Sequence, residues 1–165
     1  IPASLRDGFF QVAYVVPDLA EAEEWFRRTM GVGYFQRMEG VELGATCRHR
    51  GAASDAILDL SIGYLGSTQL ELVRPLRGAS IHQEFLDAGG RGLHHLGFVV
   101  DDFSSTVGRL AELGMTPVAD GALETGMRVE FAYFECTDAY ASVIEVLGFD
   151  DAARAFMEDL RKKGR

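Results

Sequence analysis

Four polar residues lie on stretches of the sequence that are otherwise apolar and strand-like: Gln11, Glu71, His95 and Glu145. An imidazole nitrogen, two carboxylates and an amide oxygen together make a suitable set of ligands for a divalent metal ion. The two carboxylates would balance the charge of the ion, whereas a carboxylate buried without a cation or hydrogen bonds is very costly. These residues therefore predict a metal site, and zinc, cobalt, nickel, manganese or ferrous iron would each suit the mixed donors.

Each of these residues also has an ordinary structural interpretation. A lone glutamine or histidine on a strand is usually a hydrogen-bonded core residue, and a lone glutamate usually lies at a sheet edge or in solvent. The metal site is favoured because an internal repeat gives all four residues matching positions. Residues 11–18 align with residues 95–102, so Gln11 in the first copy corresponds to His95 in the second.

The sequence pattern predicts the element order βαβββ in both copies. Helices at 19–30 and 103–113 carry apolar residues along one face, with the glutamates of the first helix, including Glu23, on the outer face. Gly31 and Gly114 favour the ends of these helices. Further strands are expected at 34–42, 57–65 and 68–74 in the first copy, and at 116–118, 127–135 and 142–147 in the second.

Together these elements predict an α+β fold in which residues 1–165 form one domain. Its expected parts are a first βαβββ repeat (9–76), a connecting helix and turn (77–92), a second repeat (93–149) and a C-terminal helix (150–165). With 165 residues, of which 47% are hydrophobic, the chain is long enough to bury a core without disulfides.

Side chains alternate between the two faces of a strand, so residues two apart share a face. Gln11 shares its face with Ala13, and His95 shares its face with Gly97; in each pair the small residue leaves room beside the polar one. By the same rule His94 should face away from His95, so we expect it to pack or form hydrogen bonds instead of binding the metal.

Charge and composition exclude several classes of partner. The 25 acidic residues exceed the 16 basic ones, and four of the basic residues lie at 161–165. Such a negative body would repel a nucleic acid backbone and an anionic membrane surface. No apolar run approaches the roughly 20 residues of a membrane span. Cys47 and Cys136 lack a C-x-x-C spacing and are expected to be unbridged thiols in a reducing compartment, the cytoplasm.

The repeat resembles the vicinal oxygen chelate superfamily, which includes glyoxalase I, methylmalonyl-CoA epimerase, the fosfomycin and bleomycin resistance proteins and the extradiol dioxygenases. The resemblance is carried by residues 12–19, 69–76 and 92–98, covers about 9–149, and is closest to the epimerase-like and glyoxalase-like branch. It implies paired half-barrels with a divalent metal between them. Epimerases usually have histidine where Gln11 stands, and animal-type glyoxalase I has an amide there.

The resemblance also implies the ligand set Gln11, Glu71, His95 and Glu145, and a metal-dependent isomerase, epimerase or lyase. The substrate would be a small molecule with neighbouring oxygens, and the metal would stabilise an enolate formed by proton abstraction. Glu145 is the first candidate for the catalytic base and Glu71 is the second. A homodimer is expected as well.

Two alternative functions stay open at this point. Resistance proteins of this fold bind small molecules without turnover, and a dioxygenase would use two histidines and one carboxylate, although the set contains one histidine. Tyr133 and Tyr140 are candidates for hydroxyl groups that line the pocket; the alternative is that they are ordinary packed tyrosines. Arg74, Arg77 and Arg91 are candidates for holding a substrate carboxylate or phosphate, against ordinary solvent exposure.

Overall fold

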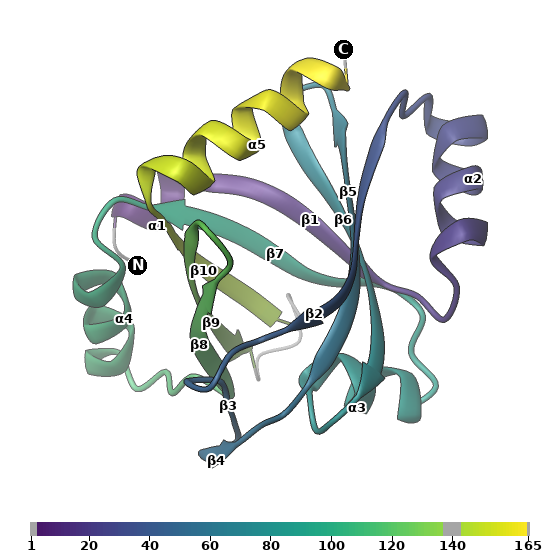
Figure 1. Ribbon diagram of the computed structural model, residues 1–165. Helices are drawn as coiled ribbons and strands as arrows, with labels where there is room; N and C mark the ends of the chain where they lie inside the picture. The colour runs from purple at the N-terminus through teal and green to yellow at the C-terminus, as the bar shows by residue number, and fades with distance from the viewer. Residues whose placement is uncertain (1–2, 137–142, 165) are drawn as a thin grey trace.

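The computed structural model describes residues 3–136 and 143–164, which form one curled sheet with helices outside it (Figure 1). In chain order the strands are β1 (Phe9–Val15), β2 (Phe35–Glu42), β3 (Arg48–His49), β4 (Ala52–Ala53), β5 (Ile57–Leu65), β6 (Thr68–Arg77), β7 (Gly92–Val100), β8 (Ala119–Glu124), β9 (Arg128–Glu135) and β10 (Val143–Phe149). The helices are α1 (Ala3–Asp7), α2 (Leu19–Met30), α3 (Ile81–Asp87), α4 (Phe103–Glu112) and α5 (Asp151–Lys163).

The order of strands repeats itself on either side of the central pair, β1 and β7, which run antiparallel. From this pair outward come β6, β5 and β2 on one side, and β10, β9 and β8 on the other. Across the centre Gln11 pairs with Gly97 and Ala13 pairs with His95. Gln11 corresponds to His95 and Ala13 corresponds to Gly97 in the repeat, so the pairing stays the same when the two copies are interchanged. The predicted α+β fold of two βαβββ units is confirmed.

Helices α2 and α4 cover the outer face of the curled sheet (Figure 1). Asp18 and Asp102 cap them by accepting hydrogen bonds from the backbone amides of Glu21 and Ser105. Gly31 ends α2 in the left-handed conformation, with φ 74°. The face of β1 that carries Tyr14 packs under α2, and the face that carries Gln11 borders a pocket.

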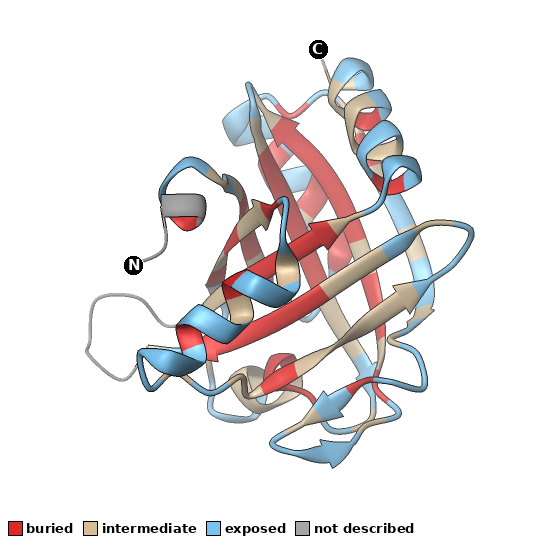
Figure 2. Cartoon of the chain, turned by 90° about the vertical axis from the view of Figure 1, so that its left-hand side faces the viewer, coloured by how far each residue is buried: buried red, intermediate tan, exposed pale blue. Residues whose placement is uncertain are grey.

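Helix α5 closes one end of the curled sheet. Its Leu160 packs with Ile62 and Tyr64 of β5, and the Tyr64 hydroxyl donates a hydrogen bond to the carbonyl of Met157. Figure 2 shows that buried residues follow the central strands, whereas the outer faces of the helices are exposed. None of the helices in the described ranges has the length and apolar character needed to cross a membrane.

Three details differ from the sequence-based expectations. The strand expected at 116–118 is wrong: β8 begins at Ala119, and of the expected segment only the Val118 amide bonds to β9, at the Tyr133 carbonyl. Pro117 has no amide hydrogen to donate to a ladder. The glutamate at position 23 does not lie on the outer face of α2 but is buried against β2 and β5. The short elements α1, β3 and β4 carry no periodic pattern and were not expected. Cys47 and Cys136 form no disulfide.

Candidate metal centre

Three of the four predicted ligands converge at one point. Glu71 lies on β6, His95 on β7 and Glu145 on β10, and all three are buried. His95 Nε2 is 3.5 Å from Glu71 Oε2 and 3.2 Å from Glu145 Oε2. Their donor atoms all lie within 4.8 Å of one another, a spacing that could hold one metal ion.

The register of the sheet accounts for this convergence. Glu71 pairs with Ala13 between β6 and β1, and Glu145 pairs with Gly97 between β10 and β7. Ala13 and Gly97 are equivalent residues of the two copies, and His95 is the partner of Ala13 across the centre. The two carboxylates therefore lie symmetrically about the central strands, each beside a residue small enough to leave space.

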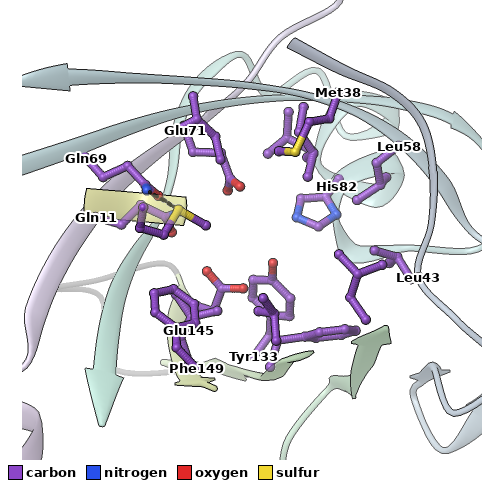
Figure 3. Close-up of a pocket in the computed structure, with 18 of the residues that line it drawn as sticks. Gln11, Met38, Leu43, Leu58, Gln69, Glu71, His82, Tyr133, Glu145 and Phe149 are labelled. Carbon is purple, nitrogen blue, oxygen red and sulfur yellow. Dashed lines mark hydrogen bonds between the residues drawn. The ribbon is translucent and has the colours of Figure 1, made fainter. Parts of the chain in front are cut away.

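Gln11, the fourth predicted ligand, lies beside this group at the position equivalent to His95. Its Nε2 donates a hydrogen bond of 2.8 Å to Gln69 Oε1, while its own Oε1 is buried without a partner. Gln11, Glu71 and Glu145 all border the same pocket (Figure 3). The hydrogen bond to Gln69 thus fixes the amide with its oxygen available as a ligand.

The unpaired atoms at this point fit a metal ion. Within the described residues, Gln11 Oε1, His95 Nε2 and Glu145 Oε2 are buried and have no hydrogen-bond partner, since the close approaches of His95 to the carboxylates are not directed as hydrogen bonds. A buried polar atom left unpaired costs about 1–3 kcal/mol. A divalent ion would satisfy all three atoms and neutralise the two carboxylates, so the donor set suits mixed nitrogen and oxygen coordination.

The charges in this group depend on one another. Burial lowers the pKa of His95, but the carboxylates of Glu145 and Glu71 outweigh this effect and raise the pKa to about 9. Burial raises the pKa of Glu71, and the charge of Glu145 adds to the rise against the opposing effect of His95. The carboxylates therefore require a positive charge next to them. In the protein without a metal ion, a protonated His95 supplies this charge.

His94 does not face away from His95 as alternation predicted. Ala13 pairs with His95 and Tyr14 pairs with Leu93, so His94 is the extra residue of a β-bulge. The two histidines instead lie Nδ1 to Nδ1 at 2.9 Å, joined by a hydrogen bond. This bond turns the Nε2 of His95 toward the carboxylates. His82, His94 and His95 also lie close enough together to hold a metal ion, so the expectation that His94 does not bind the metal stays a prediction.

The candidate metal centre borders a cavity of about 80 Å³. Thirteen of the nineteen lining residues are apolar. The six polar ones are Gln11, Gln69, Glu71, His82, Tyr133 and Glu145. His95 is fully buried and is not among the lining residues.

His82, on α3, is a lining residue that the sequence analysis missed. Its side chain is buried, and neither of its ring nitrogens has a hydrogen-bond partner among the described residues. Its ring packs against His94 and Tyr133, with centroids 5.2 and 5.5 Å apart. Burial, with the nearby His94 and His95, lowers the pKa of His82 well below 6.5. A single histidine in a seven-residue helix carried no signal that could have identified it.

The other residues considered from the sequence have varied positions. Tyr133 pairs with Glu145 across β9 and β10 and lines the cavity; burial, with the charge of Glu145, raises its pKa well above 10, so the phenol stays protonated. Tyr140 lies outside the described residues. Arg74 forms an ion pair with Asp59, and Arg77 and Arg91 do not line the cavity.

Comparison with known proteins gives a family and several similar folds. The model of the glyoxalase/bleomycin resistance protein/dioxygenase superfamily matches residues 10–133. A search of curated proteins gave no match.

Three solved structures illustrate the likeness. Methylmalonyl-CoA epimerase from Mycobacterium tuberculosis is 21% identical, with a TM-score of 0.67 over 94% of this chain and 96% of that one. A variant of the Streptomyces coelicolor epimerase, in complex with 2-nitronate-propionyl-CoA, is 19% identical, with a TM-score of 0.63 over 86% and 96%. A hypothetical protein from Bacillus halodurans is 15% identical, with a TM-score of 0.63 over 87% and 94%. At these identities the structures show a common fold.

Proposed function

Because the chain belongs to the glyoxalase/bleomycin resistance protein/dioxygenase superfamily, we propose that it is a metal-dependent isomerase, epimerase or lyase. Its substrate is a small molecule with neighbouring oxygens, and the reaction begins with loss of a proton from the carbon next to them. The observation that carries this proposal is the convergence of His95 Nε2 with Glu71 and Glu145, at 3.5 and 3.2 Å, beside a cavity that both carboxylates line. The fold shared with epimerases supports an isomerase in particular.

Gln11, Glu71, His95 and Glu145 are the proposed ligands. When bound, a divalent ion would hold the substrate oxygens and stabilise the negative charge that develops on them. Zinc, cobalt, nickel, manganese and ferrous iron suit these donors. The unpaired oxygen of Gln11 supports this assignment, because it would otherwise be a buried atom without a partner. The position of His95 Nε2 between the two carboxylates supports it as well.

Glu145 is the proposed base, with Glu71 as the second candidate. Both carboxylates line the cavity, and the one that takes the proton would first leave the bound ion. The protonated phenol of Tyr133 lies on the neighbouring strand, opposite Glu145, and can donate a hydrogen bond to the carboxylate or to a substrate oxygen. For isomerisation the carboxylate that takes the proton returns it to the neighbouring carbon, whereas epimerisation requires an acid on the opposite face of the same carbon.

The proposal is tested first by elemental analysis of protein purified without added metal. We expect about one divalent ion per chain in the wild type, and much less in a Glu71→Gln, Glu145→Gln double variant. The control is Glu112→Gln, which changes an exposed glutamate of α4 and should keep its metal. Absence of metal in the wild type, even after incubation with each of the five ions, would contradict the proposal.

Catalysis is tested separately by incubating the metal-loaded protein in heavy water with a panel of α-hydroxyketones and 2-alkyl-1,3-dicarbonyl compounds. We expect the protein to accelerate deuterium entry into at least one of them. Glu145→Gln that retains its metal should lose this rate, while Glu112→Gln should keep it. Bound metal without exchange in any compound would instead favour a protein that binds its ligand without turnover.

A further inference from the structure

Beyond the candidate metal centre, most of the cavity wall is apolar. Met38, Leu43 and Leu58 line it on the side away from Gln11 (Figure 3), and Val129 and Phe131 of β9 line it as well. A cavity with a few grouped carboxylate and amide oxygens and a mostly apolar wall fits a ligand with oxygens in one part and hydrocarbon in the rest.

No lysine or arginine lines the cavity within the described residues, and residues 137–142 contain neither. Three arginines directly follow or precede lining residues, but they belong to other contacts. Arg37, before Met38, binds Glu23 of α2, and Arg74, after Val73, binds Asp59. Arg128, between Met127 and Val129, binds Glu124 and Glu130. Strand alternation places all three arginines on the other face of the sheet. A carboxylate or phosphate on the substrate would therefore be desolvated in this cavity without a cation from the protein.

The volume of the cavity and the flexibility of its wall limit the size of the apolar part of the ligand. A volume of about 80 Å³ admits only a few non-hydrogen atoms. Met38, Met127 and Met157 lie in its wall, and methionine side chains can rearrange to fit a slightly larger group.

His82 adds one polar contact to this apolar wall. It is 2% exposed, and both its ring nitrogens lack hydrogen-bond partners, which is costly unless a ligand supplies one. A hydroxyl or carbonyl on the ligand would satisfy one ring nitrogen without adding charge.

We propose that the substrate is a small, uncharged molecule with a short apolar body, and that one polar atom of it, separate from the two neighbouring oxygens, forms a hydrogen bond with His82. This inference rests on the proposed function for the placement of the neighbouring oxygens. It adds the class of the substrate, which is a neutral and partly apolar molecule and not an anionic acid or a phosphate ester.

The first test uses two hydroxamates, whose neighbouring oxygens bind metal ions, and compares their affinities for the metal-loaded protein by calorimetry. Butyrohydroxamic acid ends in a methyl group, and the monohydroxamate of succinic acid ends in a carboxylate. We expect the methyl-ended probe to bind at least ten-fold more tightly. Equal or tighter binding of the carboxylate-ended probe would overturn the inference.

A lining variant checks that the preference arises in this cavity. Leu123→Lys places a cation in the wall at a half-buried position on β8, and should shift the affinity ratio several-fold toward the carboxylate-ended probe. Leu113→Lys adds the same charge at an exposed position and should leave the ratio unchanged. A ratio that responds equally to both substitutions would show that overall charge, and not the cavity, sets the preference.

The role of His82 is tested with 3-hydroxybutyrohydroxamic acid, which adds one hydroxyl to the methyl-ended probe. In the wild type the hydroxyl should strengthen binding several-fold, and in His82→Phe it should give no gain. Butyrohydroxamic acid is the internal control, because its affinity should change little in the variant. A hydroxyl effect that survives in His82→Phe would exclude this contact.

A protein that binds no metal would contradict the proposed function but would leave the substrate class open to test. Butyramide and succinamic acid then replace the hydroxamates, and saturation-transfer nuclear magnetic resonance compares their binding. Stronger binding of butyramide would uphold the neutral, apolar class. Preference for succinamic acid, or binding of neither compound, would contradict it.

Discussion

At the scale of single residues, the position of Gln11 depends on the absence of a side chain at Gly97. A Cβ atom at Gly97 would lie 2.6 Å from Gln11 Oε1 and 2.9 Å from Gln11 Cβ, closer than such atoms approach. The equivalent residue of the first copy, Ala13, is completely buried beside His95. Small residues on the two central strands therefore make the space in which the larger polar side chains meet.

Gly97→Ala should displace Gln11 and weaken metal binding. Because the added methyl group overpacks a buried site, we expect a loss of about 1–3 kcal/mol in the free energy of unfolding. Urea denaturation measures the stability, and titration with a competing chelator measures the metal affinity. The matched control is Gly108→Ala in α4, where a Cβ would meet nothing within 4 Å; it should increase stability by about 0.5–1 kcal/mol. Unchanged metal affinity in Gly97→Ala would remove Gln11 from the ligand set.

His94→Leu should weaken metal binding without removing a ligand. The substitution deletes the 2.9 Å hydrogen bond between His94 Nδ1 and His95 Nδ1, so the ring of His95 is no longer held with its other nitrogen toward the carboxylates. Loss of a group that orients a metal ligand typically lowers affinity about 10–100-fold. Chelator competition measures the change, and partial recovery in His94→Asn would separate hydrogen bonding from packing. Wild-type affinity in His94→Leu would contradict this role.

At the scale of elements, α2 is joined to the sheet by a buried charge as well as by apolar packing. Glu23 is 3% exposed and accepts hydrogen bonds from Arg37 Nε at 2.6 Å and from Ser61 Oγ at 2.7 Å. Arg27, one turn later in the helix, lies 3.1 Å away. A buried carboxylate with these partners connects α2 to both β2 and β5.

This ion cluster predicts a stability that depends on pH. Burial raises the pKa of Glu23, but Arg37, Ser61 and Arg27 outweigh it and lower the pKa below the usual 4.5. A carboxyl group with a lowered pKa in the folded state stabilises the protein above the unfolded value, and this contribution is lost as the pH falls through the folded value. Glu23→Gln should therefore cost about 1–3 kcal/mol at pH 7.

The difference between Glu23→Gln and the wild type should shrink as the pH falls below about 4.5, where the unfolded carboxyl is protonated. Urea denaturation of metal-free protein at pH 7, 5 and 3.5 gives the three differences. Glu24→Gln, on the exposed side of the same helix, should change stability by less than about 0.5 kcal/mol at each pH. A constant difference for Glu23→Gln would show that its charge contributes nothing.

Elements with a local signal could be predicted from the sequence. Residues 19–30 and 57–65 are a helix and a strand as expected, because the apolar pattern lies within each segment and the helix is flanked directly by its capping residues, Asp18 and Gly31. Burial of Glu23 could not be predicted, since its partners on β2 and β5 are distant in sequence. The bulge that turns His94, and the contact of α3 with the cavity, likewise depend on pairing between distant segments.

The candidate site was more predictable than these contacts because an internal repeat carries long-range information. Equivalent positions in two copies imply equivalent places on either side of a twofold axis, which is why Glu71 and Glu145 could be placed together from the sequence. Their roles as ligands and bases stay predictions, as does the homodimer, which light scattering on the purified protein would check.

At the scale of the whole molecule, α5 closes the curled sheet and supplies Met157 to the cavity. Leu160 is 1% exposed and packs with Ile62, which also lines the cavity. The closing helix thus links the stability of the fold to the shape of the cavity.

Leu160→Ala should lower the free energy of unfolding by about 2–5 kcal/mol, because it leaves a cavity beneath α5. Urea denaturation measures this loss. Leu113→Ala removes the same atoms from a side chain that is 61% exposed and should have little effect. Equal effects of the two substitutions would show that α5 does not pack as described.

The symmetry of the central strands has a stereochemical consequence. Glu71 and Glu145 are equivalent residues of the two copies, related by an approximate twofold axis. In a perfectly symmetric site each face of a planar, deprotonated carbon would meet an equivalent carboxylate, and the proton would return to either face equally. Two pairs of equivalent positions break the symmetry. Gln11 of the first copy corresponds to His95 of the second, and Gln69, the strand partner of Gln11, corresponds to Val143, the strand partner of His95. Handedness in the product would therefore originate in these two pairs of unlike residues, and the degree to which they differ would set the enantiomeric preference.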